Sequence, residues 1–247
     1  MATTTAQYEV NQVTPDADVT FDRKVGEQYV KYAHMLAGRG FIQSSLGNMA
    51  IRAPHPKYPD GVCYVKPNGV SLEEIEVDDL VITDVPTGRL LHGDRGTTVG
   101  HQMNREMLRL RPDIHCVIHL HHDETVALLS TGVEEIKPLG LTFPYLMQKP
   151  PHFLPAHINV ENDVAPIKTF IQGTNCVLMK RHGFTVLGRT VSECYHRVCI
   201  LAAEVKRIII AELVGAARGV KPDTLTQEEM EWMYRHGDAV MYPQVKR

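Results

Sequence analysis

Apolar residues recur at helical or strand spacing along most of the chain, and this pattern predicts alternating helices and strands. Val25, Tyr29, Ala33 and Leu36 repeat every three or four residues, which is typical of a helix with one buried face. By the same criterion we expect helices at residues 21–39, 101–110, 123–130 and 190–213.

Short apolar or alternating runs between these helices predict strands, because buried strands are only a few residues long. These runs end the segment 41–52 and occupy residues 62–65, 79–84, 116–121 and 176–180. Residues 158–175 are expected to contain one further strand and a short helix. The order of these elements predicts a single domain of the α/β class.

The composition is that of an ordinary globular protein, and it excludes several classes of function. Of the 247 residues, 43% are hydrophobic and 22% are charged, and the formal net charge is −3. A nucleic-acid-binding domain would carry a basic stripe, and a membrane helix would need about 18 consecutive apolar residues. The sequence has neither, so we expect no nucleic-acid partner and no membrane partner.

The cellular compartment is predicted from the N-terminus and the cysteines. Residues 1–19 lack the apolar core of a secretory signal, and the five cysteines show no paired spacing. Unpaired cysteines are typical of a reducing compartment. We therefore expect a cytoplasmic protein with free thiols.

Histidine is the residue type that indicates chemistry, with 13 copies in the chain. His119 and His121 are two positions apart on a predicted strand, so their side chains project from the same face. His182 follows another predicted strand and precedes Gly183, which permits a tight turn there. Three neutral imidazoles with an open fourth position bind catalytic Zn(II), and the same ligands suit Fe(II), Mn(II) or Co(II). We predict that these three histidines hold one divalent metal ion.

A purely structural role is the alternative for each histidine. An isolated strand histidine is more often hydrogen-bonded in the core or hydrated at the surface than bound to a metal. For two histidines two positions apart, such as His119 and His121, a metal-binding role and a structural role are equally favoured. His122 alternates to the opposite face of the strand, so we assign it a structural role.

Several segments, taken in sequence order, resemble the class II aldolase and adducin family. They are residues 47–52 (Gly-Asn-Met-Ala-Ile-Arg), 65–70 (Val-Lys-Pro-Asn-Gly-Val), 111–113 (Arg-Pro-Asp), 117–121 (Val-Ile-His-Leu-His) and 181–183 (Arg-His-Gly). The resemblance implies an α/β/α sandwich around a largely antiparallel central sheet. It also implies a homotetramer with active sites between subunits, and Zn(II) or Fe(II) held by His119, His121 and His182.

The resemblance also divides the chain into three parts. We expect a flexible N-terminal arm at residues 1–20, a catalytic domain at 21–220 and a C-terminal tail at 221–247. Tyr234 and Tyr242 in the tail are candidates to close a neighbouring active site, as a C-terminal tyrosine does in this family.

The departures from the family pattern concern its catalytic acid and its phosphate site. Family aldolases carry two serines and an acidic residue before the helix that leads to Arg-Pro-Asp, and these positions fall on Thr98, Val99 and Gly100. Glycine cannot take a proton, so the usual base is missing. Valine cannot donate a hydrogen bond to a phosphate. A further family histidine falls on Asn104. The substrate is therefore expected to lack a phosphate.

The other half of the family's phosphate site is kept at residues 45–48. Asn48 could offer its amide to a substrate, and the turn that holds Lys66 and Asn68 could form an anion-binding concavity of backbone N–H groups. A plain surface turn is the equal alternative. The predicted substrate-binding residues are Ser45, Gly47, Asn48, Lys66, Asn68 and Thr98.

A lyase would need a base in place of the missing acid. His101, Glu106 and Glu124 are the candidates, and His101 ranks first because it directly follows the altered position. A surface residue at a helix start is the equal alternative for His101. We keep His101 and Glu124 as predicted catalytic residues.

Three functions fit these residues. The first is a divalent-metal-dependent lyase acting on a C–C bond next to the carbonyl of a small hydroxy-oxo or α-oxo acid. The second is a non-heme Fe(II) oxygenase that oxidatively decarboxylates an α-oxo or α-hydroxy aryl acid, because residues 99–102 are similar to the family branch that makes prenylated hydroxybenzoate with iron. The third is a non-catalytic, adducin-like interaction protein, although such proteins generally lose the metal-binding histidines.

Overall fold

The computed structural model describes residue 16 and residues 18–241 of the chain. Its α-helices are α1 (Arg23–Ala37), α2 (His101–Leu110), α3 (Asp123–Ser130), α4 (Thr142–Met147), α5 (Val191–Arg218) and α6 (Gln227–Met241). Its strands are β1 (Asn48–His55), β2 (Tyr58–Val65), β3 (Val81–Asp84), β4 (Leu90–His92), β5 (Cys116–Leu120), β6 (His152–Leu154), β7 (Cys176–Met179) and β8 (Gly183–Gly188). Short 3-10 helices lie at Val77–Asp79, Ala165–Thr169 and Ile171–Gly173.

All of these strands belong to one sheet, in the order β4-β3-β2-β1-β5-β8-β7-β6. Neighbouring strands run antiparallel except for β6 and β7, which are parallel. β5 lies near the centre, between β1 and β8, and Asn48 and Thr185 flank His119 in the register. Residues far apart in the sequence therefore meet around the C-terminal end of β5.

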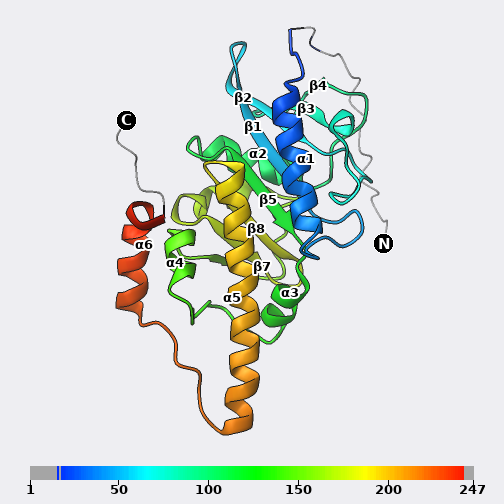
Figure 1. Cartoon of the computed structure of the whole chain (residues 1–247). Helices are drawn as coiled ribbons and strands as arrows, with labels where there is room; N and C mark the ends of the chain where they lie inside the picture. Colours follow the sequence, from blue (N-terminus) through cyan, green and yellow to red (C-terminus); the bar gives the residue numbers. More distant parts are fainter. Residues whose placement is uncertain (1–15, 17, 242–247) are drawn as a thin grey trace, which may run out of the picture.

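Helices cover both faces of the sheet, and each face has its own apolar cluster. The larger cluster packs the sheet against α1, α3, α4 and α5. The smaller cluster packs the opposite face against α2 and the 3-10 helices, through residues such as Met103, Met107 and Ile167. In Figure 1 the long helix α5 crosses one face of the sheet beside α1. The predicted α/β/α sandwich around a largely antiparallel sheet is confirmed.

Local sequence signals explain where α1 and α5, which pack on the sheet, begin. The side chain of Asp22 accepts a hydrogen bond from the backbone N–H of Lys24 at the start of α1, at 2.9 Å. The hydroxyl of Thr190 accepts one from the backbone N–H of Glu193 at the start of α5, at 3.1 Å. Such N-caps satisfy backbone donors that the helix leaves free.

The structure corrects several predicted elements. The strand predicted within residues 158–175 was wrong, because this segment forms turns and 3-10 helices. Its apolar residues Val160, Ile167 and Ile171 pack singly into the smaller cluster instead of extending the sheet. The sequence prediction also missed β4, β6, β8 and α4, which are short or contain proline or glycine.

The two ends of the chain lie partly outside the described residues. Asp16, in the predicted N-terminal arm, accepts hydrogen bonds from Lys57 and Tyr58, at 2.7 and 2.5 Å. In the predicted tail, α6 packs against α4, and Tyr234 contacts the larger apolar cluster. Tyr242 lies outside the described residues. In the described part of the chain, no helix has the length and apolar character needed to cross a membrane.

Candidate metal centre

His119 and His121 project from the C-terminal end of β5 toward the side of the sheet covered by α2. Cys116, Ile118 and Leu120 contribute to the larger apolar cluster, whereas Val117 contributes to the smaller one. Because side chains alternate along a strand, His119 shares the face of Val117, and His121 continues the same spacing just after the strand. His119 is fully buried, and His121 is half-buried.

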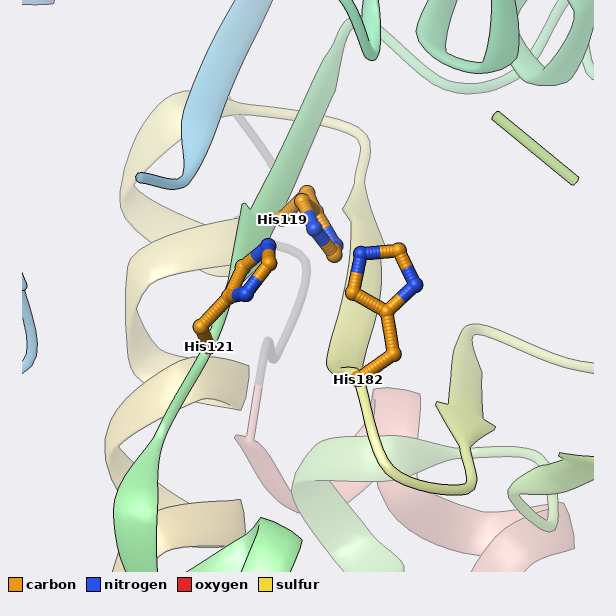
Figure 2. A group of neighbouring side chains, drawn as sticks. All are labelled: His119, His121 and His182. Atoms are coloured by element: carbon orange, nitrogen blue, oxygen red, sulfur yellow. The ribbon is translucent and has the colours of Figure 1, made fainter. Parts of the chain in front are cut away.

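His182 reaches the same place from the turn between β7 and β8. Arg181 adopts a left-handed backbone conformation with φ of 63°, and Gly183 has φ of 150°. A Cβ at Gly183 would collide with the backbone of Leu120 and His121, so only glycine lets the turn lie directly on the end of β5. This close approach places the His182 imidazole opposite those of His119 and His121 (Figure 2).

The three imidazoles form one compact cluster. Their ring centroids are 4.9 Å apart for His119 and His121, 4.9 Å for His119 and His182, and 4.6 Å for His121 and His182. One nitrogen atom of each ring lies within 4.8 Å of those of the other two. Figure 2 shows the three rings converging on a common space.

The hydrogen bonds of His119 fix which nitrogen faces that space. Its Nδ1 lies 3.0 Å from the carbonyl oxygen of Phe184, an acceptor, so Nδ1 carries the proton in the neutral ring. Its Nε2 then keeps a free lone pair. This Nε2 is buried and has no hydrogen-bond partner within the described residues. A buried polar atom without a partner is costly, and a metal ion would satisfy it.

Burial also keeps the imidazoles of His119 and His121 in the form that binds metals. Burial lowers the pKa of His119 to about 3, and the pKa of His121 is lowered for the same reason. Both rings are therefore neutral at pH 7, and neutral imidazole is the form that ligates Zn(II) or Fe(II). The donor set fits a divalent metal ion.

Glu161 is a site residue that the sequence prediction missed. Its Oε2 lies 3.2 Å from Nε2 of His182, and its Oε1 lies 3.8 Å from Nε2 of His119. Burial alone would raise the pKa of Glu161, but the hydrogen bond with His182 and the nearby imidazoles hold this pKa below its ordinary value. Glu161 lies in the segment read as a strand and a short helix. The sequence indicated it only indirectly: the family's acidic residue is replaced by Gly100, so a carboxylate from elsewhere in the chain could take its place.

The side chains of both predicted catalytic residues contact groups outside the histidine cluster. His101 is buried, and its Nε2 is 2.8 Å from the hydroxyl of Thr83. Burial lowers the pKa of His101 to about 3. The carboxylate of Glu124 is 3.1 Å from Nε2 of His122, which packs against Phe184 in the larger apolar cluster. On geometry, Glu161 is the better candidate for the missing carboxylate.

The predicted substrate-binding residues fall into two groups. Gly47 and Asn48 lie beside the histidines, and Oδ1 of Asn48 accepts a hydrogen bond from Nδ2 of Asn104 at 2.5 Å. This bond turns Nδ2 of Asn48 toward the space above Gly100. The other residues, Ser45, Lys66, Asn68 and Thr98, belong to loops that are bonded mainly to one another.

The ammonium group of Lys66 shows how these loops are joined. It is buried and donates hydrogen bonds to the carbonyl oxygens of Ser45 and Val70, at 3.0 and 2.5 Å. The carbonyl oxygen of Lys66 accepts a bond from the backbone N–H of Thr98, at 3.2 Å. The carbonyl oxygen of Gly96 accepts one from the backbone N–H of Asn68, at 2.9 Å. The side chain of Lys66 is thus occupied by the protein itself.

A comparison with protein families decides the family of this fold and site. Residues 27–207 match the class II aldolase and adducin N-terminal domain. The chain belongs to the class II aldolase and adducin family. The predicted resemblance is therefore confirmed.

Individual relatives are distant in sequence. The chain is 23% identical to L-fuculose phosphate aldolase of Methanococcus vannielii over 185 residues, which is 71% of this chain and 90% of that protein. It is 23% identical to 4-hydroxy-3-prenylphenylpyruvate oxygenase/4-hydroxy-3-prenylbenzoate synthase of Streptomyces roseochromogenus subsp. oscitans over 207 residues, which is 78% of this chain and 71% of that protein. A solved L-fuculose 1-phosphate aldolase superposes with a TM-score of 0.74 at 20% identity, over 88% of this chain and 97% of that structure.

Proposed function

We propose that this protein is a divalent-metal-dependent lyase that acts on a C–C bond next to the carbonyl of a small, non-phosphorylated hydroxy-oxo or α-oxo acid. The observation that carries the proposal is the cluster of His119, His121 and His182, in which the buried Nε2 of His119 has no hydrogen-bond partner within the described residues. A family member with a vestigial site would have no reason to keep three converging imidazoles. The metal ion is Zn(II) or Fe(II), and metal analysis distinguishes the two.

The residues around the cluster supply binding and orientation. A divalent ion held by the three histidines would act as a Lewis acid on the substrate carbonyl and on the enolate charge that develops there. Asn48 is fixed by its bond from Asn104, so its Nδ2 can donate to a substrate oxygen beside the histidines. His119 is fully buried, so water does not reach the site from the side where this imidazole lies.

One observation favours a substrate without a phosphate. Val99, at a position where family aldolases have a phosphate-binding serine, is 47% exposed, and its side chain has no hydrogen-bonding group. A phosphate therefore has no side-chain donor at this position.

An Fe(II) oxygenase that decarboxylates an aryl acid oxidatively is the second candidate. The altered positions Val99 and Gly100 favour it, because such a reaction needs neither a phosphate site nor the family's usual base at position 100. The relative named prenylphenylpyruvate oxygenase also supports it. A non-catalytic, adducin-like role is the third candidate.

Metal analysis of protein purified anaerobically, without added metal or chelator, tests the proposal. We expect one Zn(II) per chain and turnover of hydroxy-oxo acids that is independent of oxygen. Stoichiometric iron, with oxygen consumed on addition of arylpyruvates, would instead establish the oxygenase. Protein without metal and without activity after reconstitution would favour the interaction protein. A homotetramer and a cytoplasmic location are further parts of the proposal. The tetramer rests on the resemblance, and the location rests on the N-terminus and the unpaired cysteines.

A further inference from the structure

Glu161 and Gly100 share one small space beside the histidine cluster. A Cβ built on Gly100 would lie 2.6 Å from Nδ2 of Asn48 and even closer to Oε1 of Glu161. In protein structures, a Cβ atom essentially never lies closer than 3.0 Å to a heavy atom of a residue that is not its neighbour in the chain. The carboxylate of Glu161 can therefore occupy its position only because residue 100 has no side chain.

The distances from the two carboxylate oxygens of Glu161 to His182 and His119 are close to those between atoms that bind one ion. Two donor atoms held at about 2.1 Å from a metal, at the tetrahedral angle, lie about 3.4 Å apart. The two observed oxygen–nitrogen distances are 3.2 Å, to His182, and 3.8 Å, to His119. The carboxylate is thus close enough to these two histidines to bind the same ion.

The folded chain holds Glu161 in this position. The backbone N–H of Glu161 donates to Oδ1 of Asn159 at 3.0 Å, and that of Asp163 donates to the carbonyl oxygen of Asn159 at 3.0 Å. Val160 is fully buried in the smaller apolar cluster together with Met103 of α2. The side chain of Glu161 is only 14% exposed. It is therefore fixed by a turn and an apolar anchor, as expected of a metal ligand.

We propose that Glu161 is a fourth ligand of the metal centre, a carboxylate that reaches the ion from a different segment of the chain through the space that Gly100 leaves open. This inference rests on the metal-dependent function proposed for the three histidines. It adds a fourth ligand to the proposed metal centre, and it explains why residue 100 is a glycine. The centre would then consist of three imidazoles and one carboxylate.

The test compares metal binding by metal-free wild type, Glu161→Gln and Gly100→Ala. Zn(II) affinity is measured by competition with a chromophoric chelator, and the visible spectrum of the Co(II) form reports the ligand set. Asp163→Asn is the matched control for charge, because Asp163 is exposed on the same turn. Gly96→Ala is the matched control for glycine, because nothing lies within 4 Å of a Cβ built there.

Glu161→Gln should weaken Zn(II) binding at least about 10-fold and shift the Co(II) spectrum, since loss of a group that supports a metal costs about 10- to 100-fold in affinity. Gly100→Ala should weaken binding in the same way, because its Cβ displaces the carboxylate. Adding Gly100→Ala to Glu161→Gln should then have little further effect. Both controls should bind like wild type.

Two outcomes would overturn the inference. If wild type binds Zn(II) and Glu161→Gln has the same affinity and Co(II) spectrum, Glu161 is only a hydrogen-bond acceptor of His182. If Gly100→Ala binds like wild type, the role of the glycine is wrong. A wild type that takes up no metal would overturn the proposed function itself, so the two failures are distinguishable. Circular dichroism of the metal-free variants verifies that each one folds.

Discussion

The histidine cluster and the Lys66 turn (residues 66–69) are both predicted as functional sites from the sequence. In the fold they differ in whether their buried polar groups have hydrogen-bond partners. In the cluster, the buried Nε2 of His119 has no partner within the described residues. In the Lys66 turn, the ammonium group donates to the carbonyl oxygens of Ser45 and Val70. Buried polar groups are nearly always paired, so an unpaired nitrogen at the point where three imidazoles converge favours a bound ligand. A buried ammonium group that is hydrogen-bonded to the protein favours a structural role instead.

The largest expected effect is the loss of metal from the cluster. The double variant His119→Ala, His121→Ala should contain no metal and should have no activity above background, because His182 and Glu161 together are too few ligands to hold a divalent ion. Metal content and turnover are measured on the same preparation. His115→Ala, which removes an exposed histidine before the same strand, is the control and should keep its metal. Full metal content in the double variant would disprove the assignment of the cluster.

Moving the carboxylate from residue 161 to residue 100 should restore part of the Zn(II) affinity that is lost when Glu161 is removed. Glu161→Ala should weaken Zn(II) binding, and Gly100→Glu added to Glu161→Ala should recover about 10-fold in affinity or more. The reason is that a side chain on residue 100 enters the space that Glu161 otherwise occupies. Chelator competition measures both affinities. A combined variant that binds no more tightly than Glu161→Ala would show that the space does not accept a ligand from residue 100.

Replacing the lysine of the Lys66 turn should change stability and leave metal binding intact. Lys66→Met leaves two buried carbonyl oxygens without their donor, and the free energy of unfolding should fall by about 2–4 kcal/mol. Urea unfolding measures this change, and the exposed Lys168→Met is the control. Unchanged stability with weakened substrate binding would instead support the substrate-binding role predicted from the sequence.

The smallest expected effect is a dependence of stability on pH that comes from the same lysine. Burial lowers the pKa of Lys66 to about 8, whereas the ordinary value is 10.5. Between these two values the unfolded chain holds a proton that the folded chain has lost. The free energy of unfolding therefore rises with pH across this window, by at most about 1.4 kcal/mol per pH unit.

Urea unfolding of metal-free wild type and Lys66→Met at pH 8 to 10.5 isolates this contribution, since other titrating groups are common to both proteins. The difference in unfolding free energy between wild type and variant should grow in favour of wild type as the pH increases. A difference that stays constant would mean that the lysine keeps its proton in the folded chain.

Local periodicity was enough to predict several elements near the site. The helices at His101–Leu110 and Asp123–Ser130 have the predicted bounds, and the strand with His119 ends one residue before the prediction. Each has a clear repeat of apolar residues over a contiguous stretch. The segment with Glu161 has no such repeat, because its apolar residues pack one at a time against α2 and its neighbours.

The sequence by itself determined that His119 and His121 share a face, that Gly183 permits the turn with His182, and that the chain belongs to its family. These follow from neighbours in the chain or from motifs, which are visible without the fold. Only the tertiary structure decided that Glu161 lies against the histidines, and that His101 and Lys66 are bonded to other protein groups. Those contacts join distant segments, and they depend on the path of the chain between them, which local spacing does not specify.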